Sequence, residues 1–223
     1  MSQDIWNAVD TFIVDTVVGR DAVLEGALEA ASVAGLPAIS VSPAQGKLLY
    51  LLARLQGSRN ILEVGTLAGY STIWLARAMP RYGRLITLEL DPSHAAVARE
   101  NIERAGFSDV VDIRVGAALD LLTEMTQAKK EVPYDFVFID ADKKNIPEYF
   151  QLVLKLSKPG TVIVVDNVVR EGKLADASSD DEAVQAVRRF HEMLAQERRV
   201  SATTLQTVGS KGYDGFSVVM VHE

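Results

Sequence analysis

The sequence predicts an α/β fold: a doubly wound, mostly parallel sheet of seven strands, preceded by a helical extension. Short apolar runs alternate with longer stretches of helical periodicity from about residue 60 onward, and two more apolar runs close the chain. The first 56 residues carry helical periodicity only. Strands that alternate with helices are typical of βαβ units, whose right-handed crossovers place helices on both faces of a parallel sheet.

The N-terminal segment is expected to form helices that lie on or over the sheet. Apolar residues recur there at helical spacing in two sets: Ile5, Val9, Phe12 and Ile13, then Val23, Leu24, Ala27 and Leu28. Residues 35–43, rich in Pro, Gly and Ser, predict a break. A further helix is predicted at 45–55, with its leucines on one stripe: Leu48, Leu51, Leu52 and Leu55. The apolar surface of the first helix, including Trp6, exceeds what a short extension needs and predicts a homodimer.

Seven runs in the remainder have the length and composition of strands. They lie at 60–65, 84–90, 110–116, 134–140, 160–166, 200–208 and 215–221. Helical patterns lie between the first five, and the polar stretch 170–184 is interpreted as a mobile loop leading into a helix at 181–196. We find no internal repeat, so residues 1–223 are expected to form one domain, with a helical extension (1–56) and an α/β core (57–223).

Composition excludes several classes of protein and site. The net charge of −7 argues against a broad basic face for nucleic acid, although a local basic patch stays open. The chain has no cysteine, so disulfides, thiolate metal sites and cysteine nucleophiles are excluded. No apolar run approaches the roughly 20 residues that span a bilayer, and the acidic N-terminus does not resemble a signal peptide. We therefore expect a cytoplasmic protein that does not bind membranes.

The ends of the first three strands are candidates for nucleotide binding, because ligands of open parallel sheets lie beyond the carboxyl ends of strands. The first strand ends in E-x-G-x-x-x-G, with Glu63, Gly65 and Gly69. This motif differs from the dinucleotide fingerprint G-x-G-x-x-G. Its glycines would let the backbone approach a ligand. The alternative is a plain strand-to-helix turn with Ser71 or Thr72 as the N-cap.

The second and third strands end in residues suited to a nucleoside. Glu89 lies inside an apolar run at a strand end, where a carboxylate can accept hydrogen bonds from a ribose diol. Asp91, followed by Pro92, is better explained as a helix N-cap. Ala117, together with Gly116, is small enough to let an adenine ring lie against the backbone.

The fourth and fifth strands end in oxygen ligands. Asp140 lies at the tip of the fourth, and Asp166 and Asn167 lie at the tip of the fifth. Each group alone fits a turn or a helix cap, but together, if these strands are neighbours, they suit a hard cation such as Mg²⁺, Ca²⁺ or Mn²⁺. Zinc prefers His and Cys, and we interpret His94, His191 and His222 as surface residues.

Lys143 follows Asp140 closely and is a candidate general base. A free lysine is a poor base at neutral pH. A divalent cation nearby would disfavour the ammonium form and favour the neutral amine. Lys144 is expected to be solvated.

These segments together resemble the cation-dependent O-methyltransferases, the group that contains catechol O-methyltransferase and caffeoyl-CoA O-methyltransferase. The resemblance covers almost the whole chain: ISVSPAQGKLLYLL, LEVGTLAGYST, TLELDP, VGAALD, FIDADK and VVDN. It implies a Rossmann-like methyltransferase sheet and S-adenosylmethionine as cofactor. It departs from the mammalian catechol enzyme at Ala141 and Asp142, where that enzyme has an aromatic pair.

The resemblance implies roles residue by residue. It implies Asp140, Asp166 and Asn167 as metal ligands and Lys143 as catalytic base. Contacts to the cofactor are implied for Val41, Glu63, Gly65, Tyr70, Ser71, Glu89, Ala117, Asp140 and Asp142.

The expected reaction is methyl transfer from S-adenosylmethionine to one hydroxyl of an aromatic vicinal diol, which can bind a cation through two oxygens. Three alternatives stay open. They are methylation of a hydroxylated tRNA base, aided by a basic patch of Arg170, Lys173, Arg188 and Arg189; a non-catalytic S-adenosylmethionine-binding module; and a nicotinamide dehydrogenase. The missing dinucleotide fingerprint disfavours the last, and the acidic net charge makes nucleic acid an unlikely partner.

Overall fold

The computed structural model describes residues 2–128 and 132–222, and it contains one seven-stranded sheet in the order β3-β2-β1-β4-β5-β7-β6. The strands are β1 Asn60–Val64, β2 Arg84–Glu89, β3 Val111–Val115, β4 Tyr134–Ile139, β5 Ser157–Asp166, β6 Val200–Gly209 and β7 Gly212–Val221. The first five are parallel, whereas β7 pairs antiparallel with both β5 and β6. The predicted fold class is confirmed, and β5 begins three residues earlier than expected because Ser157 pairs with Tyr134.

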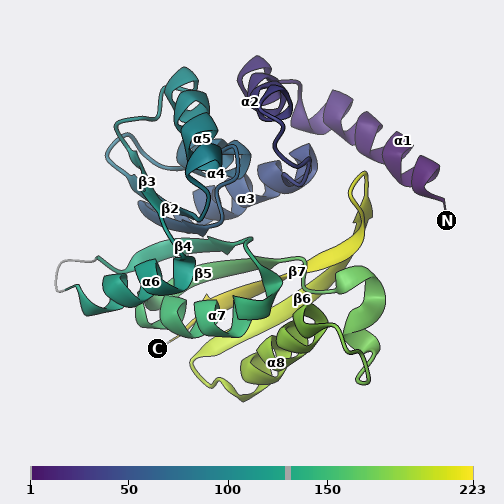
Figure 1. Cartoon of the computed structure of the whole chain (residues 1–223), viewed down its shortest axis with the longest axis vertical. Coiled ribbons are helices and arrows are strands. Elements are labelled where there is room, and N and C mark those ends of the chain that lie inside the picture. Colours follow the sequence, from purple (N-terminus) through teal and green to yellow (C-terminus); the bar gives the residue numbers. More distant parts are fainter. Residues whose placement is uncertain (1, 129–131, 223) are drawn as a thin grey trace.

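Helices cover both faces of this sheet (Figure 1). On one face lie α2 Ala22–Val33, α3 Pro43–Gln56, α4 Tyr70–Ala78 and α5 Pro92–Arg104. On the other lie α6 Ala118–Gln127, α7 Ile146–Lys155 and α8 Glu182–Gln196. A separate apolar cluster forms on each face, and the alternating side chains of β1 and β4 contribute to both. This double cover explains why the central strands are nearly continuous runs of apolar residues.

Helix α1 (Gln3–Ile13) is followed by a π-helical turn (Val14–Val18). Helix α1 does not pack into the core as α2 and α3 do. No residue of α1 is buried. The helix extends from the α2 side of the molecule to the tip of the β6–β7 hairpin (Figure 1). There the Gln3 amide donates to the Gly209 carbonyl (2.9 Å), and Ser210 N–H donates to Asp10 (2.7 Å). The extension therefore contacts the edge of the sheet through α1 and covers a face through α2 and α3.

The leucine stripe of α3 seen in the sequence packs inward only in part, because Leu48 and Leu52 are partly buried against the core. The buried residues of this helix are Gly46, Leu49 and Ala53, whereas Leu51 and Leu55 are exposed. The cause is the close approach of α4: a Cβ on Gly46 would lie 2.4 Å from the Trp74 ring. A small residue at this position lets the two helices pack tightly.

The stretch 170–184 is more ordered than the predicted loop. It contains a 3-10 helix, η3 (Arg170–Ala175), and α8 begins at Glu182 with Asp181 as its N-cap. The Arg188 guanidinium donates to the Leu174 carbonyl and ties η3 to α8. Residues 170–175 therefore form a short helical segment where a loop was expected, and the mobility of the stretch stays a prediction. Across the described ranges, we find no helix long and apolar enough to cross a bilayer.

Candidate active site

The carboxyl ends of β1 to β5 open onto two cavities. The first, of about 720 Å³, is lined mainly by residues that follow β1, β2 and β4. The second, of about 580 Å³, lies between the start of α3, the end of β5 and the β6–β7 hairpin. Asn167 lines both cavities, and Asp140 and Asp166 line one each. The predicted metal ligands therefore lie where the two cavities meet.

The turn after β1 brings the backbone against β4. Gly65 has a φ of +100°, and a Cβ there would lie 2.1 Å from the Asp140 carbonyl oxygen. Gly69, also left-handed, is the N-cap of α4, so neither Ser71 nor Thr72 takes that role. The glycines of this motif are thus required by close packing and by a left-handed backbone. Gly65, Tyr70 and Ser71 line the first cavity, where a cofactor contact was expected.

Glu63 does not line either cavity and lies in the layer beneath them. Its carboxylate is fully buried and accepts hydrogen bonds from three hydroxyls, those of Ser71 (2.6 Å), Thr72 and Thr87 (2.7 Å). Burial raises the pKa of Glu63 to about 7, although the three hydroxyls oppose that rise. Glu63 therefore lies beneath the first cavity and fixes Ser71, which lines it, and the cofactor contact implied for Glu63 stays a prediction.

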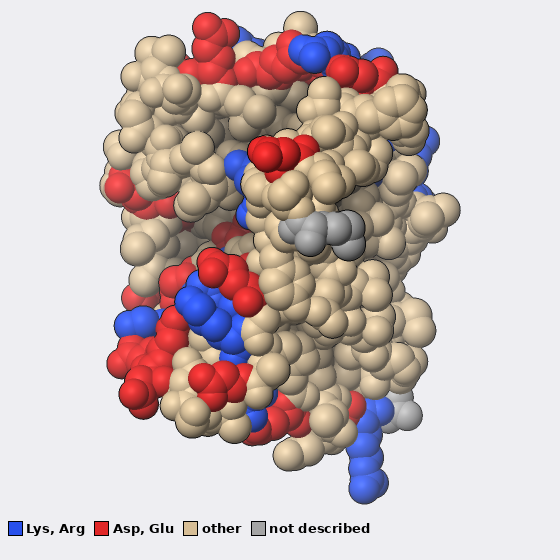
Figure 2. Space-filling model, turned by 90° about the vertical axis from the view of Figure 1, so that its right-hand side faces the viewer, with Lys and Arg blue, Asp and Glu red and all other residues tan. Residues whose placement is uncertain are grey.

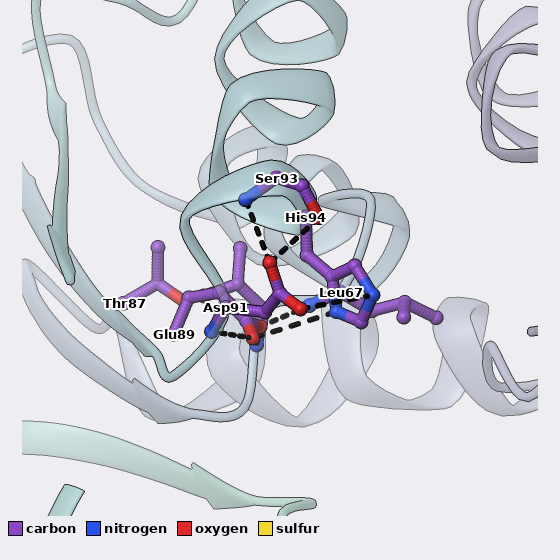
Figure 3. A network of polar contacts seen from close by, with 7 residues as sticks. Leu67, Thr87, Glu89, Asp91, Ser93 and His94 are labelled. Atoms are coloured by element: carbon purple, nitrogen blue, oxygen red, sulfur yellow. Dashed lines mark hydrogen bonds and ion pairs between the residues drawn. The ribbon is translucent and has the colours of Figure 1, made fainter. Parts of the chain in front are cut away.

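Glu89 lies at the end of β2 and is held by the backbone around it (Figure 3). It accepts hydrogen bonds from the N–H groups of Thr66 (3.2 Å), Leu67 (2.8 Å) and Asp91 (2.9 Å). A carboxylate offers about four acceptor positions. One is left for a ligand in the first cavity, which Glu89 lines. A ribose diol would therefore share the carboxylate with the turn after β1.

His94 was expected on the surface, but it lines the first cavity. Asp91 caps α5 as predicted, through Ser93 N–H (2.7 Å), and the first turn of the helix brings the imidazole back over Glu89 (Figure 3). Its Nδ1 lies 3.6 Å from a Glu89 oxygen, and its side chain is 25% exposed. His94 lies five residues after the strand-end carboxylate and in the first turn of a capped helix. This spacing could have predicted that its side chain lies near Glu89.

The remaining predicted cofactor contacts also lie around this cavity. Val41, Ala117 and Asp142 are among its lining residues. Asp142 accepts hydrogen bonds from the Tyr149 hydroxyl and from Asn145 (2.7 Å), which fix its carboxylate at the start of α7.

The ends of β4 and β5 bring two carboxylates and one ammonium group together. The Lys143 ammonium donates to Asp140 at 2.7 Å, and both side chains are largely buried. Asp166 is 5% exposed. Burial, and then repulsion from Asp140, raises the pKa of Asp166 to about 7, against the opposing effects of Lys143, Asn167 N–H and Gln45. Lys144, in contrast, pairs with Glu182 on the surface.

This arrangement fits a hard divalent cation. Among the described residues no group of three or more His, Cys, Asp or Glu side chains is arranged around a metal. The candidate set is instead two carboxylates and the Asn167 amide, a donor set suited to Mg²⁺ or Ca²⁺ with other oxygens completing the shell. A cation there would also relieve the repulsion between the two buried carboxylates.

The second cavity is built from segments far apart in the sequence. Trp6 of α1, Leu48 of α3 and Phe216 of β7 supply apolar surface, and Glu171 lies at its edge. Figure 2 shows a hollow in the side of the molecule that carries α1 and the hairpin tip. The cavity thus offers an aromatic-sized space next to the candidate metal ligands.

Three of the four basic residues proposed for nucleic acid, Arg170, Lys173 and Arg188, lie near carboxylates. Arg170 lies 3.8 Å from Asp214, and Arg188 is near Asp176. Asp181 lies close to both Arg170 and Lys173. On the face seen in Figure 2, Lys and Arg side chains lie beside Asp and Glu, without a broad basic area.

The chain matches the O-methyltransferase family over residues 15–219. It is 53% identical over 221 residues to a protein named catechol O-methyltransferase from Niastella koreensis, covering 99% of this chain and 100% of that one. An O-methyltransferase from Bacillus cereus, solved in complex with SAH, superposes with a TM-score of 0.96 at 55% identity, covering 99% of this chain and 100% of the other. TomG from Streptomyces achromogenes, involved in tomaymycin synthesis and solved in complex with SAM, gives 0.96 at 50% identity, with both chains fully covered.

The chain therefore belongs to the O-methyltransferase family, and it is an enzyme that uses S-adenosylmethionine. The predicted family and reaction class are confirmed. The alternatives of a nicotinamide dehydrogenase and of a non-catalytic binding module are wrong.

Proposed function

We propose that this enzyme methylates one hydroxyl of a catechol-like small molecule, with a divalent cation held by Asp140, Asp166 and Asn167. The observation that carries the proposal is the position of these oxygens. They lie beside Lys143 at the junction of two cavities, one lined by the predicted cofactor residues and one with an aromatic-sized space. A vicinal diol presents two adjacent oxygens to such a cation, which a monophenol cannot do.

S-adenosylmethionine would occupy the first cavity. Glu89 and His94 would contact the ribose side, Ala117 the adenine, and Val41, Tyr70, Ser71 and Asp142 the methionine and sulfonium side. The acceptor would occupy the second cavity, between Trp6, Leu48 and Phe216. The methyl group would then pass between the cavities close to Asn167, which lines both.

Lys143 would be the general base. A bound cation supplies Lewis acidity, which makes an acceptor hydroxyl easier to deprotonate. Asp140 holds the lysine amine in place at 2.7 Å. Lys143 would take the proton of the acceptor hydroxyl while the acceptor oxygen forms a bond to the methyl carbon of S-adenosylmethionine and the bond from that carbon to sulfur breaks, which would leave S-adenosylhomocysteine.

The proposal is tested with matched acceptors. Purified enzyme with methyl-labelled S-adenosylmethionine and Mg²⁺ should methylate catechol at least about 100-fold faster than resorcinol or phenol, because only the vicinal diol can bind through two oxygens. Equal rates on the three would contradict it. Transfer to a hydroxyuridine-containing tRNA that falls steeply with salt would instead favour the RNA alternative.

We also propose that the enzyme is a homodimer that pairs through α1. Ile5 is 51% exposed, Val9 51% and Phe12 66%, and no residue of the helix is buried in the described chain. Two hydrogen bonds to the hairpin tip hold α1 without covering this apolar face. Exposed apolar surface of this kind usually marks an interaction site.

A further inference from the structure

The backbone from the end of β5 into the first half of η3 carries four left-handed residues, and Glu171 and Gly172 interrupt the helical geometry of η3. Asn167 has a φ of +58°, Arg170 of +56° and Glu171 of +58°, and Gly172 follows at +85°. Left-handed backbone is costly for residues other than glycine, and it persists only where the surroundings enforce it. This connection presents Asn167 and Glu171 to the second cavity. The contacts that hold this connection in its conformation therefore also determine the shape of the second cavity, the proposed acceptor site.

One side chain on β7 makes the enforcing contacts. Asp214 Oδ1 accepts hydrogen bonds from Val169 N–H (3.0 Å), Arg170 N–H (2.8 Å) and Gly215 N–H (3.0 Å). Its Oδ2 lies 3.8 Å from the Arg170 guanidinium. The carboxylate thus binds the connection through two of its backbone N–H groups and one of its side chains.

The register of the sheet explains why β7 can do this. Asp166 pairs with Phe216, so β7 continues beyond the end of β5 and runs alongside the connection. Val168 N–H donates to the Gly215 carbonyl at 3.0 Å. A Cβ on Gly215 would lie 2.6 Å from Val169 Cγ2, so the two segments are in close contact.

We propose that Asp214 is a positioning residue that holds the 167–171 connection in its left-handed conformation and thereby places Asn167 and the wall of the acceptor cavity. The inference rests on the proposed function for the roles of Asn167 and the cavity. Asp214 itself lines the second cavity, but its hydrogen bonds reach none of the three proposed metal ligands, so it acts on them through the backbone.

The test compares Asp214→Ala with Asp214→Asn and with Asp176→Ala. Asparagine keeps an Oδ1 acceptor and loses the charge. Asp176 is a matched control, because its Oδ1 accepts from Ser178 N–H (2.9 Å) in the same manner, at an exposed site outside both cavities. For each variant we would measure amide hydrogen exchange at 168–172 without metal, the Kd for Mn²⁺ and for S-adenosylmethionine, and KM and kcat with catechol.

Asp214→Ala should speed exchange at 168–172 by about tenfold or more and raise the Mn²⁺ Kd and the catechol KM by about tenfold, because two backbone donors lose their acceptor. The S-adenosylmethionine Kd should stay within about twofold, because its proposed site lies at the other strand ends. Asp214→Asn should remain within about threefold of wild type in every measurement, because the acceptor is kept. Asp176→Ala should match wild type.

Several results would overturn the inference. Faster exchange with unchanged Mn²⁺ Kd and catechol KM would make Asp214 merely structural, and an equal loss of S-adenosylmethionine affinity would indicate general destabilisation. If Asp214→Ala does not fold, Asp214→Ser can replace it, because the serine hydroxyl is a shorter hydrogen-bond acceptor. Asp214→Ser should change the exchange rate, the Mn²⁺ Kd and the catechol KM in the same directions but by smaller factors. Wild-type enzyme that binds no Mn²⁺ would refute the proposed metal, while exchange and catechol KM would still decide the role of Asp214.

Discussion

Replacement of Glu63 by Gln should change how stability depends on pH. Burial raises the pKa of Glu63 from 4.5 to about 7, so the folded protein holds this proton more tightly than the unfolded chain does. Folding is therefore favoured below pH 4.5, and this contribution is lost as the pH rises toward 7. A pKa rise of this size corresponds to about 3 kcal/mol in total, and to roughly 2.5 kcal/mol between pH 5 and pH 8.5.

Glutamine fits the same site without an ionisable group. Its oxygen can accept from Thr72 and Thr87 as the carboxylate does. The Ser71 hydroxyl can rotate to accept from its NH₂ group. The variant should therefore gain about 2.5 kcal/mol relative to wild type between pH 5 and pH 8.5. The pKa of Asp166 is also raised, to about 7, but its effect is common to both proteins and cancels in the difference.

Urea unfolding at several pH values, in EDTA and without cofactor, measures this difference. Glu103→Gln, at an exposed position of α5, is the control and should follow the wild-type curve. Parallel curves for wild type and Glu63→Gln from pH 5 to pH 8.5 would show that the pKa of Glu63 is not raised, because the three hydroxyls would then fully compensate the carboxylate for burial.

Three further predictions follow from the site and the extension. Glu89→Ala should weaken S-adenosylmethionine binding by about 2–3 kcal/mol in a calorimetric titration. It should also lower the Tm, since Glu89 accepts three backbone N–H groups. An unchanged affinity would exclude Glu89 from the ribose site. Lys143→Met should lower kcat by about 10²–10⁴-fold while Mn²⁺ and S-adenosylmethionine still bind. A near wild-type rate at neutral pH would mean that Lys143 is not the base. Light scattering at micromolar concentration should give about twice the chain mass of 24.3 kDa, and Phe12→Glu should reduce it to one chain. A single-chain mass for wild type would rule out the dimer.

Much of the fold follows from patterns that a sequence displays directly. The alternation of apolar runs and helical stretches reflects a sheet covered on both faces, and Asp91 followed by Pro92 marks the start of α5 because capping is a local interaction. The inward face of α3 was not predictable in this way. It is determined by the room that Gly46 leaves for Trp74, which is a contact between two helices.

In the candidate site, too, some residues could be predicted from local sequence patterns, whereas others depend on contacts between distant segments. Asp140, Asp166 and Asn167 could be grouped from the sequence because the ends of adjacent parallel strands meet at one edge. The position of His94 depends on how the first turn of α5 folds back over Glu89, and the role of Glu63 depends on hydroxyls from α4 and β2. Arg170 and Glu171 are left-handed, and nothing about these two residue types predicts a left-handed backbone. Asp214, 44 residues after Arg170, accepts the backbone hydrogen bonds of Arg170 and of Val169 before it.

Methyl transfer to catechol by metal-depleted enzyme tests whether the reaction depends on a divalent cation. The enzyme is treated with EDTA, shown to be metal-free by elemental analysis, and assayed before and after addition of Mg²⁺. We expect no transfer without metal, full recovery with Mg²⁺ and retained binding of S-adenosylmethionine throughout, because the proposed cofactor contacts lie mainly at other strand ends. Asp140→Ala and Asp166→Ala should reproduce the EDTA result and resist ordinary Mg²⁺ concentrations, with Asn167→Ala less impaired because its ligand is neutral. Full activity in metal-free enzyme would show that the reaction needs no bound cation.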